Sequence, residues 1–467
     1  MMHIPQPSPY RPERTIERLG NAFYDVVKAA EFPKTILRFR NDHWAAAIGL
    51  DSLTDEEWLD HFGRFAPLPD NLPEPLALRY HGHQFRVYNP EIGDGRGFLF
   101  AQLRDDRGRL LDLGTKGSGQ TPYSRFGDGR LTLKGGIREV LATEMLEALG
   151  VETSKSFSLI ETGEALERND EPSPTRSSVL VRLGHGHIRI GSFQRLAFFE
   201  QREEMRTLIG YCLEHFFGET AGDDGPARLL DLVSQGTARL AASYIAAGFV
   251  HGVLNSDNIA ITAESFDYGP WRFTPYWDGG FTAAYFDHNG LYSFGRQPEA
   301  IHWDLVQLAA SLRLLAEADA LMPALEAFPV RFQDALRTAI LARLGVEPID
   351  PDRDTALVTA LETGLTTKTV MIDRVFFDWR GGRRRGESPA DEEFRSEAFA
   401  PFTERIAAYR SAVSLDHDYW SDAAPCSMHI DELEQIWASI DERDDWTAFY
   451  EKIDAIRRMG EAMQSHG

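Results

Sequence analysis

The chain has 467 residues, 43% of them hydrophobic and 11% aromatic, which is enough for two or three lobes around separate apolar cores. Its formal net charge of −23 argues against nucleic-acid binding, because phosphate neutralisation needs a basic surface. Two cysteines, Cys212 and Cys426, are too few for a disulfide framework or a cysteine-rich zinc site. The start of the chain lacks an apolar leader, and no run of about eighteen apolar residues occurs, so we expect a cytoplasmic protein with no membrane segment.

The first 200 residues predict a short extension followed by a lobe built on a sheet. Residues 1–75 have a Pro-rich start and then place Phe23, Tyr24 and Trp44 in mixed helical segments, so we treat them as an N-terminal extension. Residues 76–200 change to short strands broken by glycine, with one helix among them. The expected strands cover 98–103, 111–115, 157–160 and 178–183, and the expected helix covers 137–149 and ends at Gly150.

The remainder of the chain is mostly helical. Residues 201–380 contain a long apolar helix over 229–247, ended by Gly248, and Cys212 lies in an apolar helical pattern typical of a core. Residues 381–467 are more polar and form a helical C-terminal region. Arg380 and the run 383–385 lie between glycines, which favours a solvated loop. Strands with one helix, then a catalytic loop and helices, predict an α+β, two-lobed protein-kinase-like fold.

The stretch from His251 to Asn258 has the spacing of a protein-kinase catalytic loop. His251 and Asn258 keep the seven-residue separation, residues 259–262 predict a short strand, and Asp267-Tyr-Gly stands where a kinase has Asp-Phe-Gly. The amide oxygen of Asn258 and the carboxylate of Asp267 suit Mg²⁺ or Mn²⁺, since these ions prefer hard oxygen ligands. This half of the loop therefore predicts a metal site.

The position of the catalytic base differs from that of a kinase. Val253 stands in the kinase slot for the base and cannot accept a proton. Asp257, next to Asn258, is the nearest candidate base for an incoming hydroxyl. The alternative interpretation is that Asn255 and Asp257 are ordinary turn residues, because Asn and Asp favour loops.

Three further features predict phosphate binding. Gly93-Asp-Gly95-Arg96-Gly97 lies where a glycine-rich loop should fall, although Gly-Asp-Gly is also an ordinary hairpin turn. Lys116 ends a strand and Glu139 lies on the next helix, which suits the ion pair that holds a phosphate-binding lysine; each could also be a surface charge. Arg182 and Arg189 can make bidentate contacts with phosphate.

These residues and their surroundings resemble the selenoprotein O (YdiU) family of pseudokinases. The order and spacing hold from about residue 75 to 315. The matching stretches are Pro75-Leu-Ala, Gly82-His-Gln-Phe85, Gly93-Asp-Gly-Arg96, Leu113 to Arg130, Ile137-Arg-Glu139, His187-Ile-Arg189, Gly191-Ser-Phe193, His251-Gly-Val with Asp257-Asn258, Asp267-Tyr-Gly-Pro270, Gln297-Pro298 and Trp303.

The resemblance implies an enzyme that binds ATP in an inverted orientation and transfers AMP to Ser, Thr or Tyr hydroxyls of protein substrates. Asp257 is then the base, Asn258 and Asp267 hold the metal, and Glu139 supports Lys116. The nucleotide contacts that it implies are Gly93, Gly95, Arg96, Lys116, Asp128, Gly129, Arg182, Arg189 and Asp267.

Other interpretations remain open at this point. The chain could be a catalytically inactive nucleotide-binding scaffold, an ordinary kinase that uses Asp257 as base, or an enzyme that transfers UMP from UTP with Mn²⁺. Many members of the family carry a redox-active Cys or selenocysteine near the C-terminus, whereas this chain ends Gln464-Ser-His-Gly467. A redox role for Cys426 is left open.

Overall fold

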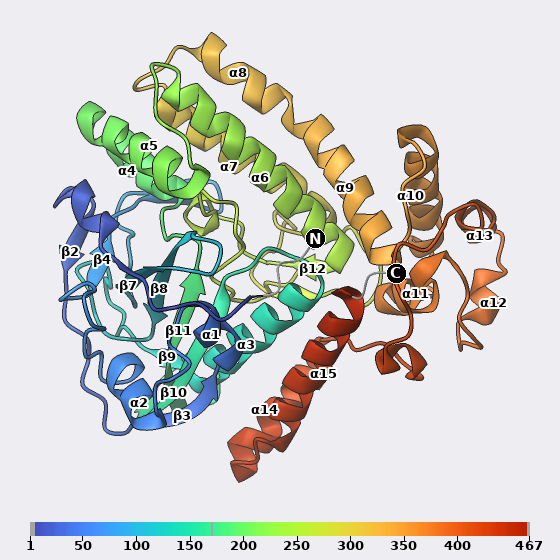
Figure 1. Cartoon of the computed structure of the whole chain (residues 1–467), viewed down its shortest axis with the longest axis horizontal. Helices are drawn as coiled ribbons and strands as arrows, with labels where there is room; N and C mark the ends of the chain where they lie inside the picture. Colours follow the sequence, from blue (N-terminus) through green and yellow to red (C-terminus); the bar gives the residue numbers. More distant parts are fainter. Residues whose placement is uncertain (1–4, 170, 465–467) are drawn as a thin grey trace.

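An antiparallel nine-stranded sheet forms one lobe and a group of long helices forms the other (Figure 1). This computed structural model describes residues 5–169 and 171–464. Residues 465–467, on which the expectation about a C-terminal cysteine falls, lie outside the described residues. The predicted α+β, two-lobed architecture is confirmed.

The sheet is assembled from strands that lie far apart in the sequence. Its spatial order is β2 (Tyr24–Val26), β4 (Leu76–Leu78), β7 (Leu99–Arg104), β8 (Leu110–Lys116), β11 (Thr175–Gly184), β10 (Lys155–Leu166) and β3 (Ile36–Arg40). In addition, β1 (Pro12–Glu13) pairs with β7, and β9 (Leu131–Thr132) pairs with β11. The four strands predicted between residues 98 and 183 are confirmed within β7, β8, β10 and β11.

The first 75 residues differ from the prediction in their local structure. Tyr24 lies in β2, which pairs with β4, so its predicted place in a helical segment is wrong. Strands β1 and β3 also come from this part of the chain and join the same sheet. Helices α1 (Asp42–Ala47) and α2 (Asp55–Phe62) follow. The boundary at residue 75 stays a prediction.

Strand alternation sends functional side chains to one face of the sheet. Val179, Val181 and Leu183 of β11 pack into the core that contains Trp58 of α2. Arg182 alternates with them and therefore points to the opposite face, as successive strand residues do. The register pairs Arg182 with Gly114, and Leu180 with Lys116, so the Arg182 and Lys116 side chains emerge side by side on that face.

Helix α3 (Leu133–Ala148) covers this face of the sheet and contacts β10 and β11. It begins one turn before the predicted 137–149 helix, because the Thr132 side chain accepts from the backbone N–H of Gly135 at 3.1 Å and caps the N-terminus. The side chains of Ile137, Val140 and Leu141, which belong to this helix, are fully buried. Glu139 is thereby fixed next to the two strands that carry Lys116 and Arg182.

The helical lobe is centred on α6 (Gly225–Ala247), which confirms the long apolar helix and its end at Gly248, a residue in the left-handed conformation. The helices around it are α4 (Ile190–Phe198), α5 (Arg202–Phe217), α7 (Gln297–Leu312), α8 (Ala318–Glu326) and α9 (Phe328–Leu344). Cys212 on α5 is fully buried, as expected for a core residue.

The helical C-terminal region returns to the sheet lobe. Before residue 381 lie α10 (Pro351–Leu365) and α11 (Ile372–Asp378). The region itself, predicted at 381–467, contains α12 (Asp391–Phe394), α13 (Ala400–Ile406), α14 (Ile430–Arg443) and α15 (Thr447–Gln464). Figure 1 shows α15 alongside α3. Arg457 of α15 forms an ion pair of 2.8 Å with Glu144 of α3. Helix α15 therefore stabilises the helix that carries Glu139.

Two further predictions are wrong. Residues 259–262 form no strand of their own: backbone hydrogen bonds link Ile259 and Ile261 only to the segment at 188–190, and Ala263 then turns into a positive φ. Arg380 is 2% exposed and does not lie in a solvated loop, because its guanidinium donates to backbone carbonyls at the ends of α9 and α15.

The remaining elements are short. They are the strands β5 (Gly82–Gln84), β6 (Val87–Asn89), β12 (Phe249–Val250) and β13 (Arg272–Phe273), and the 3-10 helices η1 (Thr15–Leu19), η2 (Ser256–Asn258), η3 (Phe294–Arg296), η4 (Arg380–Gly382) and η5 (Asp418–Ser421). Within the described residues no helix is both long enough and apolar enough to cross a bilayer.

Candidate active site

Four charged side chains meet between the two lobes. Nζ of Lys116 lies 2.6 Å from Oε2 of Glu139 and 2.9 Å from Oδ1 of Asp267. Arg182 bridges the same two carboxylates, with 3.3 Å from its NH1 atom to each. The expected pair of Lys116 and Glu139 is therefore present. It extends into a cluster that joins β8, α3 and β11 of the sheet lobe to the Asp-Tyr-Gly segment.

The cluster keeps Asp267 ionised. Although its enclosed position raises the pKa of Asp267, the positive charges of Lys116, Arg182 and Arg189 outweigh this effect and hold the pKa well below its usual range. The side chain remains 27% exposed. A permanently charged carboxylate with access to solvent is suited to binding a divalent cation.

The catalytic loop sets the orientation of Asn258. Its Nδ2 donates to the backbone carbonyl of Val253 at 2.9 Å, which fixes the side-chain amide and leaves Oδ1 as the atom for a ligand. His251 is buried, and its Nε2 donates to the carbonyl of Phe266 at 3.0 Å. The loop and the residue preceding Asp267 are thereby tied together.

Asp257 is a buried carboxyl group, 7% exposed, in the 3-10 helix η2. Burial raises the pKa of Asp257 to about 7, against the lowering effect of Arg189. Its Oδ1 has no hydrogen-bond partner within the described chain. A carboxyl group of this kind can accept a proton from a hydroxyl placed beside it, which is the role predicted for Asp257.

The short hairpin of β5 and β6 lies directly on the catalytic loop. Backbone N–H groups of His83 and Phe85 donate to the side chains of Ser256 and Asn255, at 2.8 and 3.0 Å. A Cβ atom at Gly82 would lie 2.8 Å from Oδ1 of Asp257. Sequence reasoning missed this contact, because Gly82 stood out only as part of the family resemblance.

Arg189 is buried and lies at the other side of Asp257. Its NH1 donates to the backbone carbonyl of Asp257 at 3.0 Å, and its guanidinium stacks 4.3 Å from the ring centroid of Tyr80. The NH2 atom lies 3.5 Å from Oδ1 of Asp94, a second residue that sequence reasoning missed. Asp94 stands between Gly93 and Gly95, and its charge within this glycine segment is the sequence feature that could have identified it as a site residue.

The glycine segment 93–97 is not a hairpin turn. It connects β6 to β7, which belong to different sheets. A Cβ atom at Gly93 would lie 2.5 Å from Tyr123, so the glycine permits close packing of the following loop. Arg96 is exposed, and its charge contributes to the low pKa of Asp267. The structure thus brings Arg96 toward the charged cluster.

Asp128 and Gly129 lie in the loop before β9. The carboxylate of Asp128 pairs with Arg168 of the β10–β11 connection at 2.8 Å, and the structure does not join it to the Lys116 cluster. Gly129 has a positive φ of 71° and packs against Gly119. The nucleotide contacts expected of these two residues stay predictions.

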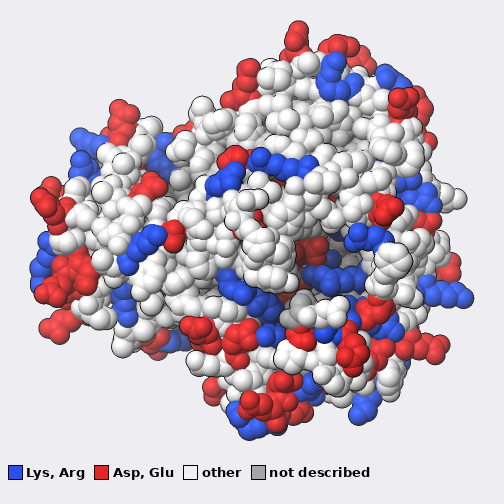
Figure 2. Space-filling view, turned by 180° about the vertical axis from the view of Figure 1, so that it is seen from behind, with Lys and Arg blue, Asp and Glu red and all other residues white. Residues whose placement is uncertain are grey.

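The residues of the site fit a metal ion that is bound partly by the protein and partly by the phosphate oxygens of a nucleotide. Among the described residues, no group of three or more His, Cys, Asp and Glu side chains forms a metal cage. Asn258 and Asp267 are the residues that could hold such an ion through two oxygen atoms, and Mg²⁺ commonly takes one or two protein ligands together with waters and phosphate oxygens. Figure 2 shows a hollow in one face of the molecule with basic and acidic side chains around it.

Comparison with known proteins agrees with this geometry. The family model described as protein adenylyltransferase SelO matches residues 9–457. A protein of Gloeobacter violaceus named protein nucleotidyltransferase YdiU is 43% identical over 464 residues, covering 96% of this chain and 95% of the relative. Proteins of the same name from Synechococcus elongatus and Marinomonas sp. are 49% and 35% identical, covering 73% and 90% of this chain and 68% and 86% of the relatives.

These matches define the chain, which has a kinase-like fold, as a nucleotidyltransferase. The chain belongs to the SelO family, as the resemblance of its motifs predicted.

Proposed function

We propose that this protein transfers AMP from ATP to Ser, Thr or Tyr hydroxyls of target proteins and releases pyrophosphate. The observation that carries the proposal is the arrangement around Asp257. The kinase base position holds Val253, whereas Asp257 has a buried carboxyl group, precedes the proposed metal ligand Asn258 and accepts a hydrogen bond from Arg189 at its backbone carbonyl. Family membership, under a description that names adenylyl transfer, supports the same chemistry.

In this proposal the cations surround the triphosphate. Lys116, Arg182 and Arg189 are all buried. Once a divalent metal occupies Asp267, these three cations would face two paired carboxylates, those of Glu139 and Asp94. An inverted nucleotide would place its β- and γ-phosphates against these cations, where bidentate guanidinium contacts stabilise the leaving pyrophosphate.

The reaction then needs one proton transfer and one displacement. Asp257 takes the proton of the acceptor hydroxyl as its oxygen bonds to the α-phosphorus, and the bond from that phosphorus to the bridging oxygen of pyrophosphate breaks. A bound Mg²⁺ or Mn²⁺, held by Asn258 and Asp267, would polarise the phosphate oxygens. Lys116 and the two arginines hold the charge that accumulates on pyrophosphate.

The test is incubation with ATP labelled either at the α- or at the γ-phosphorus. We expect the α label on protein and the γ label in pyrophosphate, with Mg²⁺ or Mn²⁺ present. Transfer of the γ label would indicate a kinase, and neither label an inactive scaffold; either result overturns the proposal. Labelled UTP with Mn²⁺ tests UMP transfer in parallel.

A variant assigns the base. Asp257→Asn should lower the rate of α-label transfer by about 10²- to 10⁴-fold while nucleotide binding persists, because general-base catalysis contributes that much. An unchanged rate would remove Asp257 from the mechanism.

A further inference from the structure

The tyrosine of the Asp267-Tyr268-Gly269 segment has a buried hydroxyl. Tyr268 is 2% exposed, and its OH lies 2.5 Å from Oγ1 of Thr153, two residues before β10 begins. The same hydroxyl donates to Oγ of Ser265 at 2.6 Å. A phenylalanine, the residue of the kinase motif, would fill the same space without either contact.

Ser265 is itself held from two directions. Its Oγ lies 2.5 Å from the hydroxyl of Tyr244 on α6. Its backbone N–H donates to the backbone carbonyl of Glu152 at 2.9 Å, and its backbone carbonyl accepts from the backbone N–H of Ser154 at 2.8 Å. These two bonds form a parallel bridge between Thr153 and Ser265.

The four hydroxyls form a continuous hydrogen-bonded chain, and that of Thr153 also donates to the backbone carbonyl of Ser154 at 3.0 Å. Thr153, Tyr244, Ser265 and Tyr268 are each at most 2% exposed, so water cannot substitute for a lost partner. Buried polar groups require hydrogen bonds, and a fully satisfied buried network specifies one arrangement of the groups that it joins. The network therefore connects the sheet lobe, through Thr153, to the segment that contains Asp267.

Asp267 is held in an uncommon backbone conformation within this segment. Its φ is +62°, a region that residues other than glycine rarely adopt. On one side, the carbonyl of Phe266 accepts from His251 at 3.0 Å. On the other side, the next residue is Tyr268. Fixed neighbours on both sides keep the Asp267 carboxylate directed at Lys116 and Arg182.

We propose that the Tyr268 hydroxyl is a positioning residue that fixes Asp267 for metal binding before the nucleotide arrives. It acts through Thr153 and Ser265 and does not touch the metal. The inference rests on the proposed function only in taking Asp267 as a metal ligand. It implies that the Asp-Tyr-Gly segment can bind a metal without rearranging. In this it differs from the Asp-Phe-Gly segment of a kinase that must first move into place.

The test compares Tyr268→Phe with Tyr244→Phe, which removes the hydroxyl that contacts Ser265 from α6. Mn²⁺ binding is measured by electron paramagnetic resonance in the presence of an ATP analogue with a methylene bridge between the α- and β-phosphorus. We expect Tyr268→Phe to weaken Mn²⁺ binding about 10-fold, the lower end of the effect of losing a hydrogen bond behind a metal ligand. Tyr244→Phe should change it far less.

Thermal unfolding separates positioning from general stability. Both variants should unfold at similar temperatures, since each loses one buried hydroxyl. Unchanged Mn²⁺ affinity in Tyr268→Phe, or equal weakening in both variants, overturns the proposal. If Tyr268→Phe does not fold, Thr153→Val removes the partner on the sheet lobe and should weaken Mn²⁺ binding in the same way; wild-type affinity in that variant would count against the inference.

The Mn²⁺-binding test and the AMP-transfer test can fail independently of each other. If wild-type protein transfers no α label but binds Mn²⁺ with the expected dependence on Tyr268, the proposed AMP transfer fails and the positioning role stands. If α label is transferred and Tyr268→Phe binds Mn²⁺ normally, the positioning role fails and the proposed function stands.

Discussion

The ammonium group of Lys116 lies 2.9 Å from Oδ1 of Asp267, so a cation of the sheet lobe and a carboxylate of the helical lobe form an ion pair. Glu139, at 2.6 Å on the other side of the ammonium group, holds Lys116 in this position. In the proposed reaction, a metal at Asp267 would neutralise this carboxylate and leave Lys116 available to phosphate. The proposal therefore predicts that this pair links nucleotide binding to metal binding.

Removing this cation should impair catalysis strongly. Lys116→Met should lower α-label transfer by about 10²- to 10³-fold, since a preorganised charge in an enclosed site contributes that much. The measurement is the initial rate with ATP labelled at the α-phosphorus. Lys134→Met is the control, because Lys134 lies on the same helix as Glu139 but pairs with Glu434 at the surface. Equal rates in the two variants would contradict the role of Lys116.

A methyl group at Gly82 should disturb the base. Its Cβ would lie 2.8 Å from Oδ1 and 2.9 Å from Cβ of Asp257, closer than Cβ atoms normally approach. Gly82→Ala should therefore lower α-label transfer at least about 10-fold, because small displacements of a catalytic group are costly. Binding of ATP should persist, as measured by fluorescence of a labelled nucleotide.

Gly210→Ala is the matched control for Gly82→Ala. Gly210 lies in α5, and among the described residues no atom apart from its chain neighbours and the adjacent backbone of its own helix lies within 4 Å of the added Cβ. It should leave transfer unchanged and stabilise the protein by roughly 1 kcal/mol, the difference in helix propensity between Ala and Gly. A loss of activity in Gly210→Ala, or none in Gly82→Ala, would refute the steric argument.

The sequence was sufficient for those parts of the site that local pattern determines. Lys116 ends a strand and Glu139 lies on the next helix, and both elements have clear hydrophobic patterns. The ion pair between them could therefore be predicted from the order of these elements along the chain. The contact of Gly82 with Asp257 could not be predicted, because it joins segments that no local pattern connects. For the same reason, the pairing of Tyr24 with Leu78 could not be predicted from the secondary-structure propensities of the residues.

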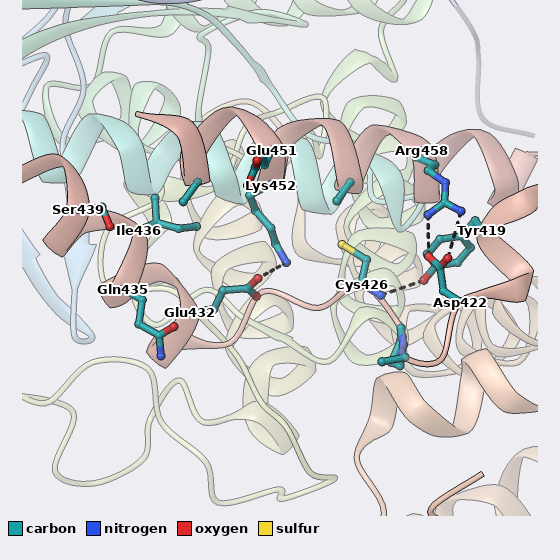
Figure 3. A pocket seen from close by; sticks show the side chains of 14 residues that line it. Tyr419, Asp422, Cys426, Glu432, Gln435, Ile436, Ser439, Glu451, Lys452 and Arg458 are labelled. Carbon is teal, nitrogen blue, oxygen red and sulfur yellow. Dashed lines mark hydrogen bonds and ion pairs between the residues drawn. The ribbon is translucent and has the colours of Figure 1, made fainter. Parts of the chain in front are cut away.

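The thiol of Cys426 should react slowly. It lies in a cavity of about 530 Å³ lined by η5, α14 and α15, where Lys452 pairs with Glu432 (Figure 3). Burial raises the pKa of Cys426 to about 11. Because only the thiolate is nucleophilic, the reactive fraction at pH 8 is about 10⁻³, and it rises as pH approaches 11.

Alkylation with iodoacetamide, followed by mass spectrometry, measures this reactivity. At pH 8 we expect Cys426 to react about 10²-fold more slowly in the folded protein than in urea, where thiols have a pKa of about 8.5. Cys212, which is fully buried, should stay unmodified until the protein unfolds. Rapid modification of Cys426 at pH 7 would restore the case for a redox role, which the raised pKa argues against.

Arg380 joins the ends of two helices that are distant in the sequence. Its NH1 donates to the carbonyls of Ala342 and Arg343 at 2.6 and 2.8 Å near the end of α9, and its NH2 donates to Met463 at 2.9 Å near the end of α15. Burial lowers the pKa of Arg380 to about 10, so it remains charged at neutral pH. Helix C-termini carry partial negative charge, which stabilises this cation.

Substitution of Arg380 should destabilise the fold, even by lysine. An ammonium group cannot reproduce the spread of guanidinium donors, so Arg380→Lys should leave buried carbonyls unpaired and lower the free energy of unfolding by about 2–3 kcal/mol. Arg383→Lys, at an exposed position of the same arginine cluster, should stay within about 0.5 kcal/mol of wild type. Urea unfolding followed by circular dichroism measures both. If the two variants were equally stable, Arg380 would not be the residue that holds α9 and α15 together.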